Sequence, residues 1–136
     1  NIKIPRNSVI FNEIDIDWKK PLIVVEGPMD LIKCPQNSTC LLGSYLSTNY
    51  KLFEKIAMNK TPVCLLLDKD AEEKAHKIAK LLVQYNVPVK INFVMTGDVG
   101  DLDVKRVSKI ADNAQNWSYT HALKARIKNI GSGSIL

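Results

Sequence analysis

The chain has 136 residues, about the length of one domain, and its 46% hydrophobic content is enough to build a single core. Its formal net charge of +5 favours a polyanionic partner without naming one. No apolar run approaches the roughly 20 residues that a membrane-spanning helix needs, and the first residues do not resemble a secretion signal. The three cysteines, Cys34, Cys40 and Cys64, are odd in number and form no C-x-x-C pair, which favours a reducing, cytoplasmic setting.

The first third of the chain contains two apolar runs of strand character. Residues 1–20 form an N-terminal extension in which Ser8–Phe11 is expected to be a short strand. Leu22–Val25 reads as a strand buried on both faces, and it ends abruptly at Glu26. Thr39–Leu42 is a second short run that ends at Gly43.

The middle of the chain repeats this pattern with helices between the strands. Apolar spacing predicts a helix over Ser47–Met58, and VCLLL at Val63–Leu67 is a third buried strand that ends at Asp68. An apolar stripe and acidic residues in the first turn predict a helix from Ala71 to about Tyr85. The remaining expected elements are a strand over Val89–Met95, a helix over Val104–Asp112 and a basic helix over Ser118–Asn129 that carries Lys124, Arg126 and Lys128.

Strands that alternate with helices indicate an α/β fold with a mostly parallel sheet of about four strands, flanked by helices. In such folds ligands collect at the carboxyl ends of the strands. We therefore expect the acidic residues that follow three of the strands to meet at one edge of the sheet. They are Glu26, Asp68 with Asp70, and Asp98 with Asp101.

Several carboxylates at one edge repel one another unless a cation lies between them, and Mg²⁺ is the simplest such cation. A cluster of this kind is a common device for phosphoryl or nucleotidyl transfer. A structural interpretation is also open for each carboxylate alone, because Asp is a frequent helix cap. Asp70 would then cap the helix that begins at Ala71, and Asp30 would cap or begin a short helix after the first strand.

Other residue types give weaker signals. His76 and His121 have no Cys or second His at metal spacing, so solvated histidines are expected rather than zinc ligands. Ser44 and Ser47 have no histidine partner at a matching strand end. Neither a P-loop nor a G-x-G-x-x-G motif occurs. Packing roles are expected for Trp18 and Trp117.

Four motifs in order resemble the Toprim domain of bacterial and bacteriophage DNA primases, a Rossmann-like fold. They are VVEGPMD (24–30), LGS (42–44), LLDKDA (66–71) and GDVGDL (97–102), and the resemblance covers about Leu22 to Val104. It implies a Toprim catalytic domain over residues 21–113, followed by a basic helix and a flexible tail over 114–136.

The resemblance implies a role for each motif. Glu26, Asp68 and Asp70 match the catalytic residues that hold Mg²⁺, with Mn²⁺ as an alternative, and the glutamate is often assigned an acid/base role as well. Asp98 and Asp101 match a late acidic loop in which one of the two faces the metal. Supporting positions are Asp30, Gly27, Gly43 and Ser44, and Lys69 is placed to contact nucleotide phosphates.

Two departures from the Toprim pattern qualify these expectations. Glu72 stands where the family commonly has a glycine, so the backbone at this point lacks glycine's freedom. The zinc-binding module and the basic template-binding subdomain of bacterial primases are also missing, so we expect a fragment of a larger enzyme.

The leading hypothesis is therefore a DNA primase domain that makes RNA primers on single-stranded DNA from ribonucleoside triphosphates, with a replicative helicase as a further partner. One alternative is a small Toprim nuclease that cleaves structured RNA with the same carboxylates. Another is a non-catalytic Toprim interaction module. A topoisomerase is the weakest alternative, because the domain with its nucleophilic tyrosine would have to lie elsewhere.

Overall fold

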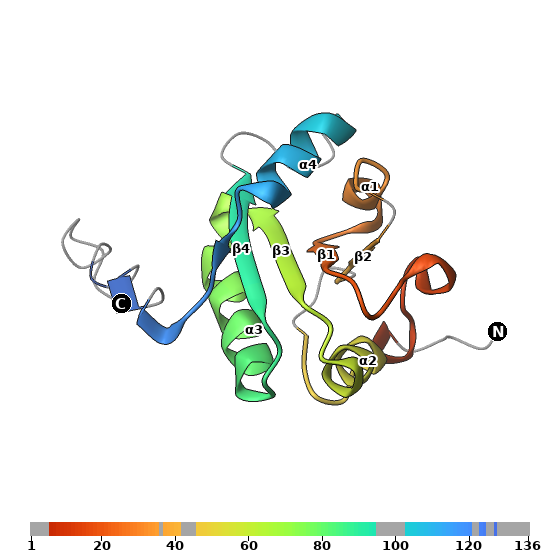
Figure 1. Cartoon of the computed structure of the whole chain (residues 1–136), viewed down its shortest axis with the longest axis horizontal. Helices are drawn as coiled ribbons and strands as arrows, with labels where there is room; N and C mark the ends of the chain where they lie inside the picture. The colour runs from red at the N-terminus through yellow and green to blue at the C-terminus, as the bar shows by residue number, and fades with distance from the viewer. Residues whose placement is uncertain are drawn as a thin grey trace.

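The computed structural model describes residues 6–35, 37–41, 46–94, 103–120, 123–124 and 127. The chain forms an α/β fold around a five-stranded sheet of order β2-β1-β3-β4-β5 (Figure 1). β1 to β4 are parallel and β5 is antiparallel to β4. The strands are β1 (Leu22–Val25), β2 (Ser38–Cys40), β3 (Val63–Asp68), β4 (Val89–Val94) and β5 (Gln115–Asn116).

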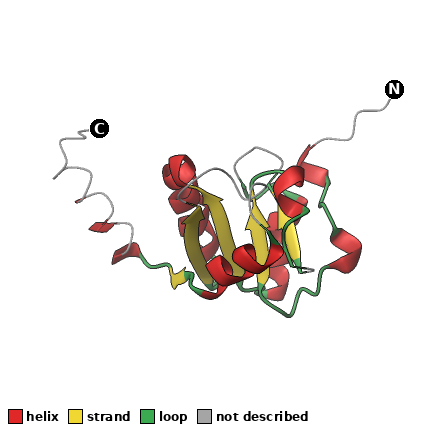
Figure 2. Cartoon of the chain, turned by 90° about the horizontal axis from the view of Figure 1, so that it is seen from above, coloured by secondary structure: helices red, strands yellow, loops and turns green. Residues whose placement is uncertain are grey.

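Helices cover both faces of this sheet (Figure 2). Side chains of α2 and α3 pack on one face in the larger core, and those of α1 and α4 pack on the other face in a smaller core. The α-helices are α1 (Pro28–Leu31), α2 (Lys51–Asn59), α3 (Glu72–Gln84) and α4 (Val104–Asp112), and short 3-10 helices span Arg6–Ser8, Glu13–Asp15 and Lys69–Ala71. The predicted fold class is confirmed.

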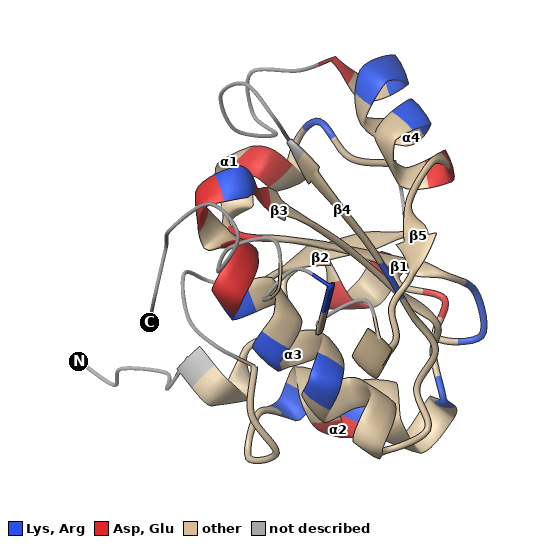
Figure 3. Ribbon diagram, turned by 90° about the vertical axis from the view of Figure 1, so that its left-hand side faces the viewer, with Lys and Arg blue, Asp and Glu red and all other residues tan. Residues whose placement is uncertain are grey.

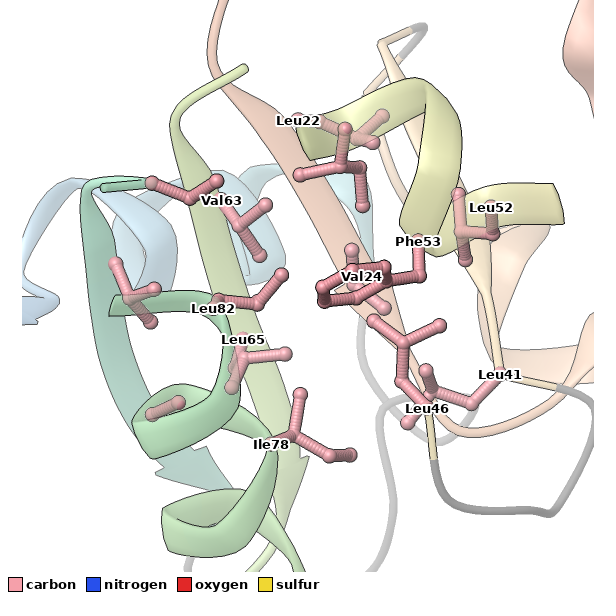
Figure 4. Close-up of a cluster of buried hydrophobic side chains, with 14 of the residues drawn as sticks. Leu22, Val24, Leu41, Leu46, Leu52, Phe53, Val63, Leu65, Ile78 and Leu82 are labelled. Atoms are coloured by element: carbon pink, nitrogen blue, oxygen red, sulfur yellow. The ribbon is translucent and has the colours of Figure 1, made fainter. Parts of the chain in front are cut away.

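The larger core shows why β1 and β3 read as continuous apolar runs. Leu22, Val24 and Leu65 point toward α2 and α3, and Leu65 lies near Ile78 and Leu82 of α3 (Figure 4). The intervening residues of the same strands pack against α1 and α4 in the smaller core. Both faces of the central strands are thus buried, as expected for a parallel sheet between helical layers.

The expected strand over Ser8–Phe11 is wrong. Ser8 ends a 3-10 helix, and the chain turns at Asn12, which has a left-handed φ of 62°. The Phe11 carbonyl accepts a hydrogen bond of 2.7 Å from the Thr39 hydroxyl instead of entering a strand ladder. Ile10 and Ile16 still reach the larger core, so the apolar pattern reflects burial of single side chains without a strand.

Two further expectations need adjustment. Residues 47–50 form a turn, closed by a 3.0 Å hydrogen bond from the Tyr50 N–H to the Ser47 carbonyl, and α2 begins only at Lys51. Of the predicted Ser118–Asn129 helix, Tyr119, Thr120, Leu123, Lys124 and Ile127 are helical, whereas Ser118 is not, and the other positions lie outside the described residues.

Candidate metal site at the carboxyl edge of the sheet

Two acidic residues stand at the carboxyl ends of adjacent parallel strands. Glu26 directly follows β1, and Asp68 is the last residue of β3. The two strands pair with Val24 opposite Leu65, so continuing this register places Glu26 level with the residue before Asp68. Asp70 follows within the 3-10 helix Lys69–Ala71 and is exposed. The predicted convergence on one edge therefore holds for the strand ends of β1 and β3.

Side chains alternate along a strand, and this alternation assigns Glu26 and Asp68 to opposite faces of the sheet. Glu26 continues the series of Leu22 and Val24, which face the larger core, and it contacts α3. Asp68 continues the series of Cys64 and Leu66, which face the smaller core. A cation shared by the two carboxylates would thus lie across the ends of the strands, beyond both cores.

Asp70 does not act as the cap that one interpretation assigned to it. The N-cap position of α3 is Ala71, and no side chain there forms a capping hydrogen bond. The capping interpretation of Asp70 is therefore wrong. Asp70 is exposed, two residues beyond Asp68.

Asp30 does serve the local structure of α1. Its Oδ2 accepts a hydrogen bond of 3.2 Å from the backbone N–H of Gly27, the residue before the helix. This satisfies one of the N–H groups that a helix start leaves without a partner. Gly27 has an extended backbone with φ of −138°, so this position does not require glycine's conformational freedom. The capping interpretation of Asp30 is confirmed.

Asp30→Ala is expected to lower the free energy of unfolding by about 0.5–2 kcal/mol, because the Gly27 N–H loses its acceptor. Asp30→Asn keeps an oxygen acceptor and is expected to lose less. Urea denaturation of both variants measures the difference. Unchanged stability in Asp30→Ala would contradict the capping role.

Lys69 is engaged at the start of α3. Its ammonium lies 2.9 Å from the carboxylate of Glu72 and 5.1 Å from the centre of the Phe93 ring. Partial burial favours the neutral acid of Glu72, but the hydrogen bond and charge of Lys69, together with His76, hold the pKa of Glu72 below its usual range. Glu72, which stands where the Toprim pattern has a glycine, thus forms an ion pair with Lys69, the lysine expected to contact phosphates.

His76 is not the solvated histidine that its sequence position predicts. Its side chain is only 16% exposed, and its Nδ1 accepts a hydrogen bond of 2.9 Å from the indole N–H of Trp117. Its Nε2 lies 3.6 Å from Glu72. The bond joins α3 to the residue that follows β5, and Trp117 is buried in the larger core, as expected. The reason for the error is tertiary, because Trp117 approaches from a distant part of the sequence.

Burial disfavours the thiolate form of Cys34 and Cys64. All three cysteines are free, and Cys40 is buried. Burial, with smaller contributions from Asp30 and Cys40, raises the pKa of Cys34 to about 12. Burial also raises the pKa of Cys64 to about 11. These two thiols are protonated near neutral pH, whereas the thiolate is the reactive and metal-binding form.

One residue of the site carried no distinguishing signal in the sequence. The ammonium of Lys74, on α3, lies 3.9 Å from Oε2 of Glu26, and its side chain is only 14% exposed. Lys77 and Lys80 lie on the same helix, and nothing in the sequence distinguishes Lys74 from these two lysines. The difference arises from the packing of α3, which turns Lys74 toward the strand end and Lys77 toward solvent.

Several expected site residues lie outside the described residues, namely Asp98, Asp101, Gly43 and Ser44. Within the described ranges, no three His, Cys, Asp or Glu side chains are grouped as a potential metal site. The donor chemistry of Glu26, Asp68 and Asp70 nevertheless fits Mg²⁺, which prefers oxygen ligands. This ion commonly binds through one or two carboxylates and completes its shell with waters and substrate phosphates.

No family model and no curated protein sequence matches the chain. Solved structures do share its fold. A structure of the zinc-binding and RNA polymerase domains of the Aquifex aeolicus primase matches with a TM-score of 0.70 and 16% identity over 95% of this chain. A DNA primase domain from Pseudomonas aeruginosa matches with a TM-score of 0.61 and 18% identity over 83% of this chain.

The chain has the fold of DNA primase domains. It spans 35% of the length of the Aquifex chain and 40% of the length of the Pseudomonas chain. In the part of the chain that the structure describes, no helix is long and apolar enough to cross a membrane.

Proposed function

We propose that the chain is the Toprim-type catalytic domain of a DNA primase, which joins ribonucleotides into primers on a single-stranded DNA template. The observation that carries this proposal is the position of Glu26 and Asp68 at the ends of adjacent parallel strands, in a fold shared with primase domains. In open α/β sheets this edge is where ligands bind.

Glu26, Asp68 and Asp70 would hold Mg²⁺ in this proposal, with one of Asp98 and Asp101 as a further ligand. When bound, the ion stabilises the charge that develops on the pyrophosphate leaving group. In this proposal Glu26 would also accept the proton of the primer 3′-hydroxyl. Its side chain, 28% exposed at the strand end, supports this role.

The charge of α4 supports a polyanionic template. Val107 of α4 is buried in the smaller core, while Lys105, Arg106 and Lys109 are exposed. Figure 3 shows the basic positions along this helix in blue. The helix lies next to the carboxyl ends of β3 and β4 (Figure 1). Cationic side chains near this edge would contact phosphates of single-stranded DNA and make binding dependent on salt. A helicase partner, proposed on the Toprim resemblance, would act outside this domain.

The test uses the chain within its full-length parent, supplied with Mg²⁺ or Mn²⁺, labelled ribonucleotides and single-stranded DNA. We expect short RNA products that require both template and metal, resolved on a denaturing gel. Cleavage of a structured RNA without nucleotide incorporation would overturn this proposal in favour of a nuclease. The absence of both activities would favour an interaction module.

A further inference from the structure

Lys74 differs from its neighbours on α3 in the direction of its side chain. Lys77 pairs with Glu73 on the solvent side of the helix and is 61% exposed. Lys74 is 14% exposed and turns toward the strand end, where its ammonium lies 3.9 Å from Glu26. Of these two lysines, Lys74 is the one whose ammonium lies against a carboxylate of the candidate metal site.

The distance of 3.9 Å is too long for a hydrogen bond, so the two groups attract chiefly by charge. A largely buried ammonium interacts more strongly with nearby charges than an exposed one, because water and salt screen it less. The edge thus combines the negative charges of Glu26, Asp68 and Asp70 with the positive charge of the largely buried Lys74. That charge repels a metal ion and attracts a polyphosphate.

We infer that Lys74 is the cationic group that the site presents to the phosphates of a nucleoside triphosphate, and that Glu26 holds it in position before substrate binds. This inference rests on the proposed function and adds a phosphate-binding residue to it. A metal ion held by Glu26 would compete with Lys74 for the carboxylate. The ammonium would then be available to a phosphate group, with which it forms a strong, charge-assisted contact.

Opposite changes in the affinities for a metal ion and for a triphosphate distinguish this role of Lys74 from a purely structural one. Removing the positive charge strengthens the attraction for a metal ion and weakens the attraction for a triphosphate. A residue that only supports the fold would weaken both, or neither. The charge also predicts that arginine, which remains cationic, substitutes better than an apolar side chain of similar length.

The experiment is calorimetric titration of the chain with Mn²⁺ alone, and then with ATP at saturating Mn²⁺. Lys74→Met is expected to bind Mn²⁺ roughly threefold to tenfold more tightly, and ATP at least about tenfold more weakly. Lys74→Arg is expected to retain ATP affinity within about threefold. Lys77→Met, on the exposed side of the same helix, is the matched control and should leave both affinities unchanged.

Circular dichroism establishes that each variant is folded, and Lys74→Gln replaces Lys74→Met if the latter is not. If Lys74→Met binds both Mn²⁺ and ATP more weakly than wild type, or binds both with wild-type affinity, the proposed role of Lys74 is overturned. Mn²⁺ titration of Glu26→Gln shows whether only the role of Lys74 is wrong or whether the proposed metal site is wrong as well. If Glu26→Gln binds Mn²⁺ as wild type does, the metal site itself is refuted, and the role of Lys74 with it.

Discussion

Asp68→Asn is expected to reduce primer synthesis by the full-length parent at least about 10²-fold, because the amide preserves size but removes the negative charge that would hold the proposed metal ion. Asp68 ends the central strand β3, and Glu26 directly follows the neighbouring strand β1, so Glu26→Gln should cause a loss of similar size. The measurement is the initial rate of labelled ribonucleotide incorporation at saturating template.

Asp15→Asn provides the matched control for this prediction. Asp15 also belongs to an Asp-x-Asp pair, with Asp17, but it lies in the N-terminal 3-10 helix Glu13–Asp15 and is exposed. The control should retain wild-type incorporation. Full activity in Asp68→Asn, or an equal loss in Asp15→Asn, would refute the assignment of the catalytic edge.

Leu65→Ala is expected to lower the free energy of unfolding by about 2–5 kcal/mol. Leu65 lies in the middle of the central strand and is 0% exposed, so truncation leaves a cavity between the sheet and α3. Urea denaturation measures the change.

Met58→Ala is the comparison for this core substitution. Met58 lies in α2 with 80% of its surface exposed, so its truncation should change the free energy of unfolding by less than about 0.5 kcal/mol. Similar losses in the two variants would contradict the position of Leu65 in the core.

The buried strands and most helices could be predicted from the sequence because their signals are local. VCLLL needs no distant partner to read as a buried strand, and β3 occupies Val63–Asp68. The helix over Val104–Asp112 was predicted with the bounds of α4. Asp103 caps it by accepting a 2.8 Å hydrogen bond from the backbone N–H of Arg106, a signal contained in four consecutive residues.

The features that sequence reasoning missed depend on tertiary contacts. β5 consists of the polar residues Gln115 and Asn116, which carry no strand pattern and become a strand only by pairing with β4. His76 was expected to be solvated, yet the indole of Trp117, 41 positions away, donates a hydrogen bond to it. Propensity and periodicity do not contain such information.

The candidate site likewise combines residues that the sequence predicted with a contact that depends on tertiary packing. Parallel strands made the shared edge of Glu26 and Asp68 predictable, because a strand ending in a carboxylate can be recognised in sequence. The contact between Lys74 and Glu26 depends on the rotation of α3 against the sheet. Asp30 carried two open interpretations in the sequence, a helix cap or a supporting residue of the metal site, and the hydrogen bond from the Gly27 N–H shows the cap.

Direct measurement of metal binding decides whether the carboxyl edge is a metal site. Mn²⁺ is titrated into the chain and followed by electron paramagnetic resonance, which detects the free ion, for wild type and for the Glu26→Gln and Asp68→Asn variants. We predict binding by the wild type and at least about tenfold weaker binding by each variant, because each loses one charged ligand. Equal affinity in all three proteins, or no binding by the wild type, would contradict a metal site built by Glu26 and Asp68.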